Sequence, residues 1–280
     1  MLAHNPLPPG FGGLGDSFTD EYEFYKLRNT ARNYVEQLDA ADIAYYGPFS
    51  ETARPDLRAQ GFAFNWGLSG ATSANLAQEV QGLLPQVESG QVQFVTILIG
   101  GNDFESGVVA SHPRTVLSNL PPVVLSSIQT AVGQILAASP TVKIAVSTLE
   151  ELEETPRLEG RVSSGQVGSG ILRLADQEQD VVNAGLRRMA NHNSRIVIAD
   201  FESQLEVVSS EPFLTVGDVE VSTTTTGTDP HNLFLSDGEH IGTIEQGLFG
   251  NVFIDAINSK FGTHFADLTD AQILATAGLS

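Results

Sequence analysis

The feature that most constrains the fold is the alternation of short apolar runs with longer amphipathic stretches along the chain. Three runs have the length and composition of buried strands, at residues 94–99, 142–146 and 196–199. Two weaker runs precede them, at residues 11–14 and 62–64. Strands that alternate with helices build βαβ units, so this order predicts helices packed around a parallel sheet.

Helical spacing of apolar residues supplies the other half of this pattern. After Thr72, a suitable N-cap, apolar side chains recur at helical intervals at Leu76, Val80, Leu83, Leu84 and Val87. Further helices are expected at residues 19–38, 124–138, 171–190 and 244–261. Five predicted strands and five predicted helices fit one doubly wound α/β domain.

Three segments interrupt this alternation, at residues 47–55, 150–170 and 212–232. They are expected to be loops, and residues 212–232 could also form a small accessory hairpin. Residues 269–277 are expected to form a short terminal helix. Since no internal repeat and no composition break marks a linker, residues 1–280 are predicted to be a single domain.

Charge and composition exclude several classes of protein. Asp and Glu number 34 against 14 Lys and Arg, so the formal net charge is −20. Nucleic acid is not an expected partner, because polyanions are bound by clustered Lys and Arg. No apolar run approaches the roughly 18 residues of a membrane span, so none is expected. Cysteine is absent, which leaves an oxygen as the only expected nucleophile.

A serine follows the first predicted strand, in the turn Gly15-Asp16-Ser17. In an open parallel sheet, ligands bind outside the carboxyl ends of the strands. At the start of a helix, backbone N–H groups and the helix dipole favour a developing negative charge, as a nucleophilic Ser17 would require. The alternative is that Ser17 merely caps the helix.

Candidate hydrogen-bond donors follow the next two predicted strands. Gly70 offers a backbone N–H, and Asn102 offers a side-chain amide in a glycine-rich turn. Both are donor types that form oxyanion holes. The alternatives are an ordinary loop glycine and an asparagine that tolerates a left-handed turn. Asp103 is expected to fix the turn by accepting from backbone N–H groups.

Two Asp–His pairs precede the last predicted helix. Histidine is the usual general base near neutral pH, and a nearby aspartate can hold its other ring nitrogen. Asp237 and His240 are three residues apart, and Asp229 and His231 form a competing pair. From the residues alone both pairs stay open, as does an exposed loop histidine with a capping aspartate.

Taken together, these blocks resemble a known family. They are, in order, Gly15-Asp16-Ser17, Gly70, Gly101-Asn102-Asp103 and Asp237-Gly238-Glu239-His240. The order is similar to that of the SGNH hydrolases, also called GDSL esterases and lipases, over residues 14–261. The resemblance implies a flavodoxin-like three-layer α/β/α fold with a five-stranded parallel sheet in the order 2-1-3-4-5. It also implies hydrolysis of a carboxylic ester.

The resemblance assigns roles to these residues. It implies that Ser17 is the nucleophile of a triad with Asp237 and His240, which favours His240 over His231. It further implies that Ser17, Gly70 and Asn102 form the oxyanion hole. No cofactor and no metal is implied. In the family the first strand is usually a solid apolar run, so the glycine-rich residues 10–13 predict a short or irregular strand here.

Expectations about the substrate and location are coarser. The sequence shows no extended apolar lid helix, so a small-molecule or carbohydrate ester, with a short acyl or acetyl group, is expected as substrate. The blocks around residues 15–22 and 100–104 resemble secreted bacterial members, which predicts an extracellular protein. Residues 1–6 lack the basic and apolar regions of a signal peptide, so none is expected in this sequence. No motif indicates an oligomeric state.

Three other readings compete with the ester hydrolase. A catalytically silent carbohydrate-binding or surface protein could retain the fold. A metal-dependent phosphodiesterase could use Asp16, Asp103 and His240, although the sequence lacks the dense Asp/His clusters of two-metal sites. An α/β-hydrolase is disfavoured, because Phe18 and Thr19 follow the serine in place of a Gly-x-Ser-x-Gly elbow.

Overall fold

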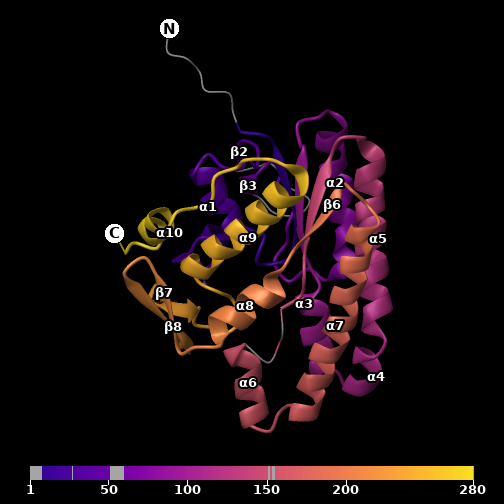
Figure 1. The fold of residues 1–280 in the computed structure, drawn as a ribbon. Coiled ribbons are helices and arrows are strands. Elements are labelled where there is room, and N and C mark those ends of the chain that lie inside the picture. The colour runs from indigo at the N-terminus through magenta and orange to yellow at the C-terminus, as the bar shows by residue number, and fades with distance from the viewer. Residues whose placement is uncertain (1–7, 27, 51–59, 151, 153–154, 280) are drawn as a thin grey trace.

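A parallel sheet forms the centre of the fold (Figure 1). The computed structural model describes residues 8–26, 28–50, 60–150, 152 and 155–279. Within these residues the sheet has four strands in the order β1-β4-β5-β6, all parallel. The strands are β1 (Phe11–Gly15), β4 (Phe94–Leu98), β5 (Lys143–Ser147) and β6 (Ile196–Ala199). The predicted α/β class with a parallel sheet is confirmed.

The first strand is regular, contrary to the expectation of an irregular one. All five residues of β1 are buried and pair in register with β4, from Phe11 opposite Phe94 to Gly15 opposite Leu98. Glycine suits this strand because the covering helix lies very close to it. A Cβ atom at Gly12 would come within 2.7 Å of Leu83 Cδ1.

The expected strand at residues 62–64 does not join the sheet as a strand. Phe62 instead belongs to a hairpin of β2 (Phe49–Ser50) and β3 (Gly61–Phe62). Beyond it, Gly13 donates to the Phe64 carbonyl at 3.0 Å and accepts from Trp66 N–H at 2.7 Å, forming one parallel bridge at Asn65. The segment therefore occupies the edge position beside β1, in the expected order, without extended pairing.

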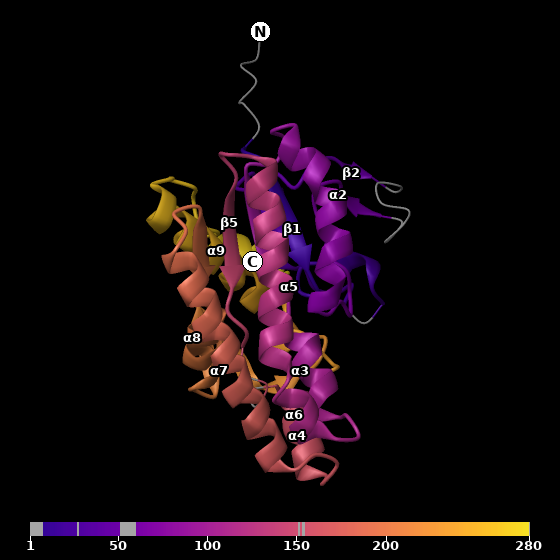
Figure 2. The same ribbon diagram turned by 90° about the vertical axis from the view of Figure 1, so that its right-hand side faces the viewer.

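Three helices cover one face of the sheet and stand side by side in Figure 2. They are α2 (Leu76–Glu88), α5 (Leu120–Ala138) and α7 (Ser169–Asn191). A short 3₁₀ turn, η2 (Ser73–Asn75), leads into α2, and Thr72 caps it through a capping box with Asn75. Leu76, Val80 and Leu83 are buried on the inner side of α2, as their spacing predicts.

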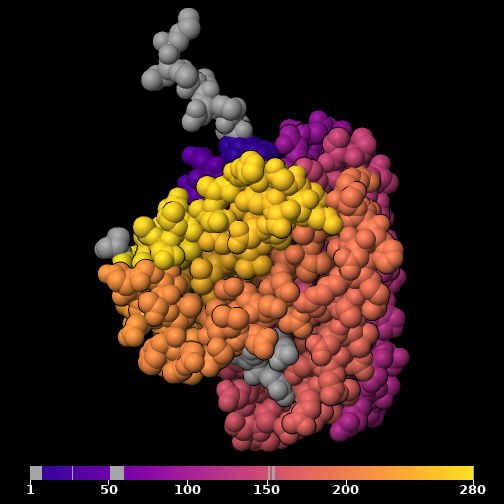
Figure 3. Space-filling model, in the orientation of Figure 1, coloured from indigo at the N-terminus to yellow at the C-terminus, as the bar shows by residue number. Residues whose placement is uncertain are grey.

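The other face is covered by α1 (Tyr34–Ala40), α8 (Phe201–Ser209) and α9 (Thr243–Phe261). Figure 3 shows how the C-terminal segments, in orange and yellow, cover this side. Residues 212–232 fall largely within a small second sheet, which packs against α8. Its strands are β7 (Phe213–Val216), β8 (Val219–Thr226) and β9 (Asn232–Phe234). The chain then continues through α9 to α10 (Asp270–Thr276).

The helix predicted over residues 19–38 is not continuous. Among the described residues of this range, only a 3₁₀ turn, η1 (Tyr22–Phe24), and α1 form. The buried carboxylate of Glu36 accepts from the backbone N–H groups of Tyr22, Glu23 and Asn33. These side-chain bonds satisfy backbone donors that a helix would otherwise pair, so the preceding chain is free to turn.

Residues 150–170, expected to be a loop, contain the helix α6 (Pro156–Ser163). Two more helices that periodicity did not reveal follow β4, namely α3 (Gly101–Val108) and α4 (Pro113–Leu117). Both α4 and α6 begin with proline at the first helical position, which is a start signal for a helix. These short helices lie beyond the carboxyl end of the sheet (Figure 1).

By length and composition alone, one stretch of the described chain, Pro113–Ala138, is apolar enough to cross a membrane, since an 18-residue window within it has a mean hydropathy of 1.3. It is not an uninterrupted apolar run, because polar residues such as Ser126 and Gln129 interrupt it. In the structure these two residues are exposed, whereas Val124, Ile128 and Ile135 pack into the core. The apolar side of α5 is therefore used within the fold.

Candidate active site

Ser17 lies in a tight turn at the carboxyl end of β1. The N–H of Asp16 donates to the Leu98 carbonyl at 3.2 Å, which holds the turn against the end of β4. The Asp16 carbonyl then accepts from Thr19 and Asp20. Glycine is required just before the turn, because a Cβ atom at Gly15 would lie 2.0 Å from the Leu98 carbonyl oxygen. This geometry presents the Ser17 hydroxyl at the end of the sheet.

The structure joins Ser17, His240 and Asp237 in one hydrogen-bonded chain. Ser17 Oγ lies 2.8 Å from His240 Nε2, and His240 Nδ1 lies 2.7 Å from Asp237 Oδ2. The serine comes from the turn after β1, and the other two come from the segment just before α9. A hydroxyl, an imidazole and a carboxylate in this order form the arrangement that activates a serine nucleophile.

Asp237 is held ionised and in place by the same short segment. Its Oδ1 accepts from the backbone N–H groups of Glu239 and His240, each at 3.0 Å. Burial by itself raises the pKa of Asp237, but the hydrogen bond and the charge of His240, with the two backbone bonds, outweigh it. The pKa of Asp237 is therefore held well below its ordinary value. Its carboxylate can then orient the ring of His240 at any pH where the histidine acts as a base.

The competing pair, Asp229 and His231, is not part of the hydrogen-bonded chain that contains Ser17. Asp229 and His231 bond to each other at 2.8 Å, with more than half of each side chain exposed, in the connection between β8 and β9. In the part of the chain that the structure describes, no hydrogen bond links either of them to Ser17. The geometry thus brings His240, and not His231, to the serine.

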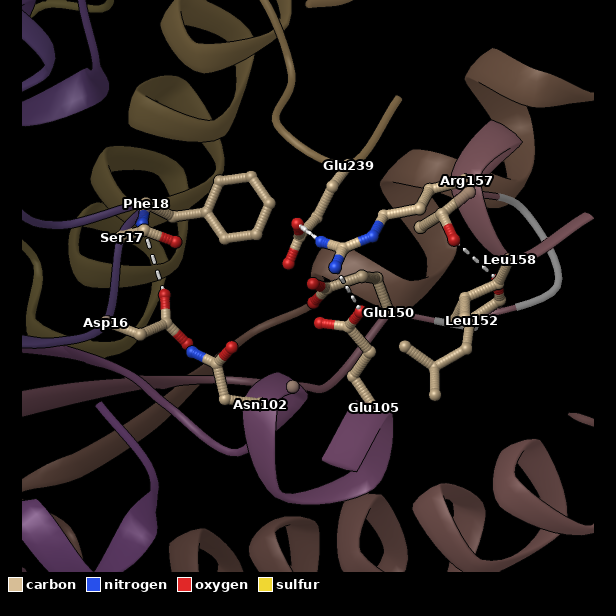
Figure 4. Close-up of a pocket in the computed structure, with 12 residues that line it drawn as sticks. Asp16, Ser17, Phe18, Asn102, Glu105, Glu150, Leu152, Arg157, Leu158 and Glu239 are labelled. Carbon is tan, nitrogen blue, oxygen red and sulfur yellow. Dashed lines mark hydrogen bonds and ion pairs between the residues drawn. The ribbon is translucent and has the colours of Figure 1, made fainter. Parts of the chain in front are cut away.

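Asn102 stands in the first turn of α3, and it lines the same pocket as Ser17 (Figure 4). Its Nδ2 donates to the Ala71 carbonyl at 2.9 Å, which ties α3 to the loop that contains Gly70. Gly70 itself is exposed in that loop and does not line the pocket. The structure therefore places Asn102 beside the serine and Gly70 one residue from the group that Asn102 binds.

Asp103 has a structural place, although not the one predicted. It was expected to fix its own turn, but its two oxygens accept from the N–H and the hydroxyl of Ser73, both at 2.8 Å. The metal-site reading required Asp103 to share an ion with Asp16 and His240. Across the described ranges, no group of three or more His, Asp or Glu side chains is arranged to hold a metal ion.

Sequence reasoning missed Arg28, which is almost fully buried beside the triad. Its Nη1 lies 3.1 Å from the Ser17 carbonyl and 3.2 Å from His240 Nε2, and its Nη2 donates to Ser69 Oγ at 2.9 Å. The guanidinium also stacks on Tyr25, 4.1 Å from the ring centre. A single arginine in a segment expected to be helical carried no pattern that could have identified it.

A pocket opens beside Ser17 (Figure 4), with a volume of about 430 Å³ that includes the solvent at its mouth. Apolar contacts come from Phe18, Leu152 and Leu158. The charged lining was not anticipated from the sequence. It consists of Asp16, Glu105, Glu150, Glu239 and Arg157.

Comparisons with known proteins agree with the fold. The family model described as the GDSL-like lipase/acylhydrolase family matches residues 14–218, so the chain belongs to this family. The protein is accordingly an ester hydrolase. The matched range contains Ser17, Gly70 and Asn102, whereas Asp237 and His240 lie beyond it and are joined to Ser17 by the geometry above. A comparison with curated protein sequences found no match.

Solved structures are similar in fold at low sequence identity. The lipase Lip_vut3 from a goat rumen metagenome is 14% identical with a TM-score of 0.57, over 89% of this chain and 97% of that one. Phospholipase A1 from Streptomyces albidoflavus NA297 is 16% identical with a TM-score of 0.54, over 90% of this chain and 99% of that one. At these identities the likeness establishes the SGNH hydrolase fold alone.

Proposed function

We propose that the protein hydrolyses carboxylic esters with short acyl groups, including acetyl esters of carbohydrates, through an acyl-enzyme on Ser17. The observation that carries the proposal is the continuous chain from Ser17 Oγ through His240 to Asp237, at the edge of a pocket. This arrangement supplies a nucleophile, a base and an orienting carboxylate without a cofactor.

In the first half of the reaction, His240 Nε2 takes the Ser17 proton as Oγ attacks the carbonyl carbon of the ester. Asp237 accepts the hydrogen bond from Nδ1 and stabilises the imidazolium that forms. The tetrahedral intermediate then breaks its bond to the alcohol oxygen, which leaves with the proton from Nε2. In the second half, water attacks the acyl-enzyme by the same route, so that the carboxylic acid and free Ser17 are regenerated.

Three donors are proposed to stabilise the negative oxygen of the intermediate. The N–H groups of Ser17 and Gly70 have no acceptor among the described residues, so both are available. Asn102 Nδ2 carries two hydrogens, and only one is needed for its bond to the Ala71 carbonyl. Donors that are fixed in place before the reaction stabilise the transition state more than the ground state.

The lining of the pocket supports a short acyl or a sugar ester over a long lipid. Its apolar surface comes from a few side chains, among them Phe18, Leu152 and Leu158, and it is interrupted by carboxylates. A long acyl chain would need a continuous apolar surface, because each buried CH₂ contributes about 0.8 kcal/mol only when it leaves water for an apolar environment.

The test is a panel of p-nitrophenyl esters from acetate to palmitate, with acetylated xylan beside it. We expect the highest kcat/KM for the shortest chains and release of acetate from xylan. Ser17→Ala should remain folded by circular dichroism and lose roughly 10⁴-fold or more in kcat. A preference for palmitate would contradict the substrate class. Binding of xylan with no hydrolysis of any ester would instead indicate a catalytically silent carbohydrate-binding protein.

A further inference from the structure

The pocket beside Ser17 has an excess of carboxyl groups. Asp16, Glu105, Glu150 and Glu239 line it, whereas Arg157 is its one lining cation among the described residues. The carboxyl groups come from four separate segments, namely the turn after β1, α3, the segment after β5 and the segment before α9. Folding therefore gathers like charges at the place where a substrate would sit.

Arg157 is already engaged with two of these groups. Its Nη1 forms a close ion pair with Glu239, and its Nη2 lies 3.2 Å from Glu105 Oε1. Arg161 reaches only Glu105, at 4.0 Å. Neither arginine is paired with Glu150 or Asp16 in the described structure, so two carboxyl groups of the pocket have no cationic partner.

Glu150 is the side chain that points to a ligand. It is 9% exposed, and its carboxylate accepts a hydrogen bond from no other described residue, only from its own backbone N–H. Figure 4 shows this carboxylate directed into the pocket, between Glu239 and Glu105. A buried carboxylate without a partner is costly, so a group that donates to it or neutralises it is stabilising.

The pKa values of carboxyl groups in this pocket also favour a cationic ligand. Burial raises the pKa of Glu150, and the nearby charge of Glu239 raises it further. Burial, followed by the charge of Glu239, raises the pKa of Glu105 to about 7, although Arg157 and Arg161 act in the opposite direction. A cation that enters the pocket lowers the pKa values of these carboxyl groups, because it favours their charged form.

We propose that this pocket binds a positively charged ammonium group of the ester substrate, with Glu150 as its main counter-ion. The inference rests on the proposed function and specifies its substrate class. Phe18 lines the same pocket, and the π face of an aromatic ring attracts a cation. A neutral sugar could donate hydroxyls to the same carboxylates, but it would leave their charge uncompensated.

Pairs of esters that differ only in charge test the proposal. On the alcohol side, acetylcholine is compared with 3,3-dimethylbutyl acetate, in which carbon replaces the quaternary nitrogen. On the acyl side, methyl 4-(trimethylammonio)butanoate is compared with methyl 5,5-dimethylhexanoate. We expect kcat/KM to be at least about tenfold higher for the cationic member of one pair, which also shows on which side of the ester the pocket lies. Such a factor is about 1.4 kcal/mol.

Glu150→Gln removes the charge and keeps the shape of the side chain. It should reduce the preference for the cationic ester to within about threefold, mainly through KM. The matched control is Glu88→Gln, which removes one negative charge at the exposed end of α2 and should leave the preference as in the wild type. As a second measurement, tetramethylammonium should inhibit wild-type hydrolysis of p-nitrophenyl acetate competitively, and more weakly in Glu150→Gln.

The outcomes separate the two proposals. If the wild type cleaves p-nitrophenyl acetate but neither prefers a cationic ester nor is inhibited by tetramethylammonium, the cation site is wrong and the esterase stands. An equal preference in the wild type and Glu150→Gln would remove Glu150 from the site. If no ester is cleaved, the proposed function fails, and the cation site fails with it.

Discussion

Arg28 Nη1 lies 3.2 Å from His240 Nε2, the same ring nitrogen that faces Ser17 Oγ at 2.8 Å. A guanidinium can only donate, so Nε2 accepts and the ring proton sits on Nδ1, toward Asp237. This is the tautomer that a base acting on Ser17 requires. Arg28 also binds the Ser17 carbonyl and Ser69, so one side chain connects the turn of Ser17, the ring of His240 and the loop of Gly70.

The first prediction concerns this connection. Arg28→Lys keeps the charge but cannot reach three partners in the fixed geometry of a guanidinium. We expect kcat to fall by roughly 10- to 100-fold with KM within about threefold, because a displacement of about 1 Å can cost 10²-fold in rate. The measurement is steady-state hydrolysis of p-nitrophenyl acetate. A purely structural role would lower the unfolding midpoint and leave kcat of the folded enzyme unchanged.

Replacement of His240 and replacement of His231 should have very different effects on activity. His240→Ala removes the base and should abolish turnover, with a loss in kcat of roughly 10⁴-fold or more. His231→Ala should retain most of the activity, since His231 bonds to Asp229 and neither residue lines the pocket. The measurement is the activity of both variants on p-nitrophenyl acetate, which shows which histidine acts as the base. The reverse result would move the acid of the triad to Asp229.

Asn102→Ala should weaken the stabilisation of the transition state. We expect kcat to fall by about 10²–10³-fold with little change in KM, as is usual for the loss of one oxyanion donor. Asp103→Asn provides the contrast, because Asp103 ties α3 to Ser73 and its replacement should mainly lower thermal stability. A rise in KM with unchanged kcat in Asn102→Ala would make Asn102 a substrate contact, and the three-donor oxyanion hole would be wrong.

The stability of the protein should depend on pH through Glu245, in the first turn of α9. Burial raises the pKa of this side chain from 4.5 to about 8, against a smaller opposite effect of Gln204. A raised pKa means that the folded state favours the protonated form. The stabilisation is therefore complete below about pH 4.5 and is lost as the pH rises through about 8.

Glu245→Gln tests this dependence, because the amide is neutral at every pH. The free energy of unfolding should match that of the wild type at pH 4 and exceed it at pH 9 by on the order of 5 kcal/mol, since the rise from 4.5 to about 8 is about 3.5 pKa units and each unit corresponds to about 1.4 kcal/mol. Urea unfolding at both values measures the difference. Glu88→Gln, on the surface, serves as the control. Equal differences at pH 4 and pH 9 would remove ionisation of Glu245 from the account.

Features of the fold that stand in a strong local pattern could be predicted from the sequence. The sheet strands β4, β5 and β6 and the helix α2 were predictable because apolar spacing alone defines a buried strand or a buried helix face. Ser17, Asn102 and His240 could be singled out as candidates because each lies in a short motif. Parallel strands bring their carboxyl ends together, so motifs at these ends converge without further information.

The features that could not be predicted depend on contacts between residues that are far apart in the sequence or on side chains that bond to the backbone. The helix predicted over residues 19–38 breaks because Glu36 accepts from backbone N–H groups that precede it. Arg28 and Glu150 belong to the site through contacts with segments far away in the chain, and neither residue type is unusual where it stands. Such contacts follow only from the completed packing.

Ser17 and His240 are separated by 223 positions along the chain. While the protein is being synthesised, the nucleophile leaves the ribosome long before the base that activates it. Contacts of such high sequence separation form late, after the intervening elements have closed the loop between them. The proposed triad is therefore complete only once the segment before α9 has packed against the turn of Ser17, and the appearance of activity would report completion of folding in a newly made molecule.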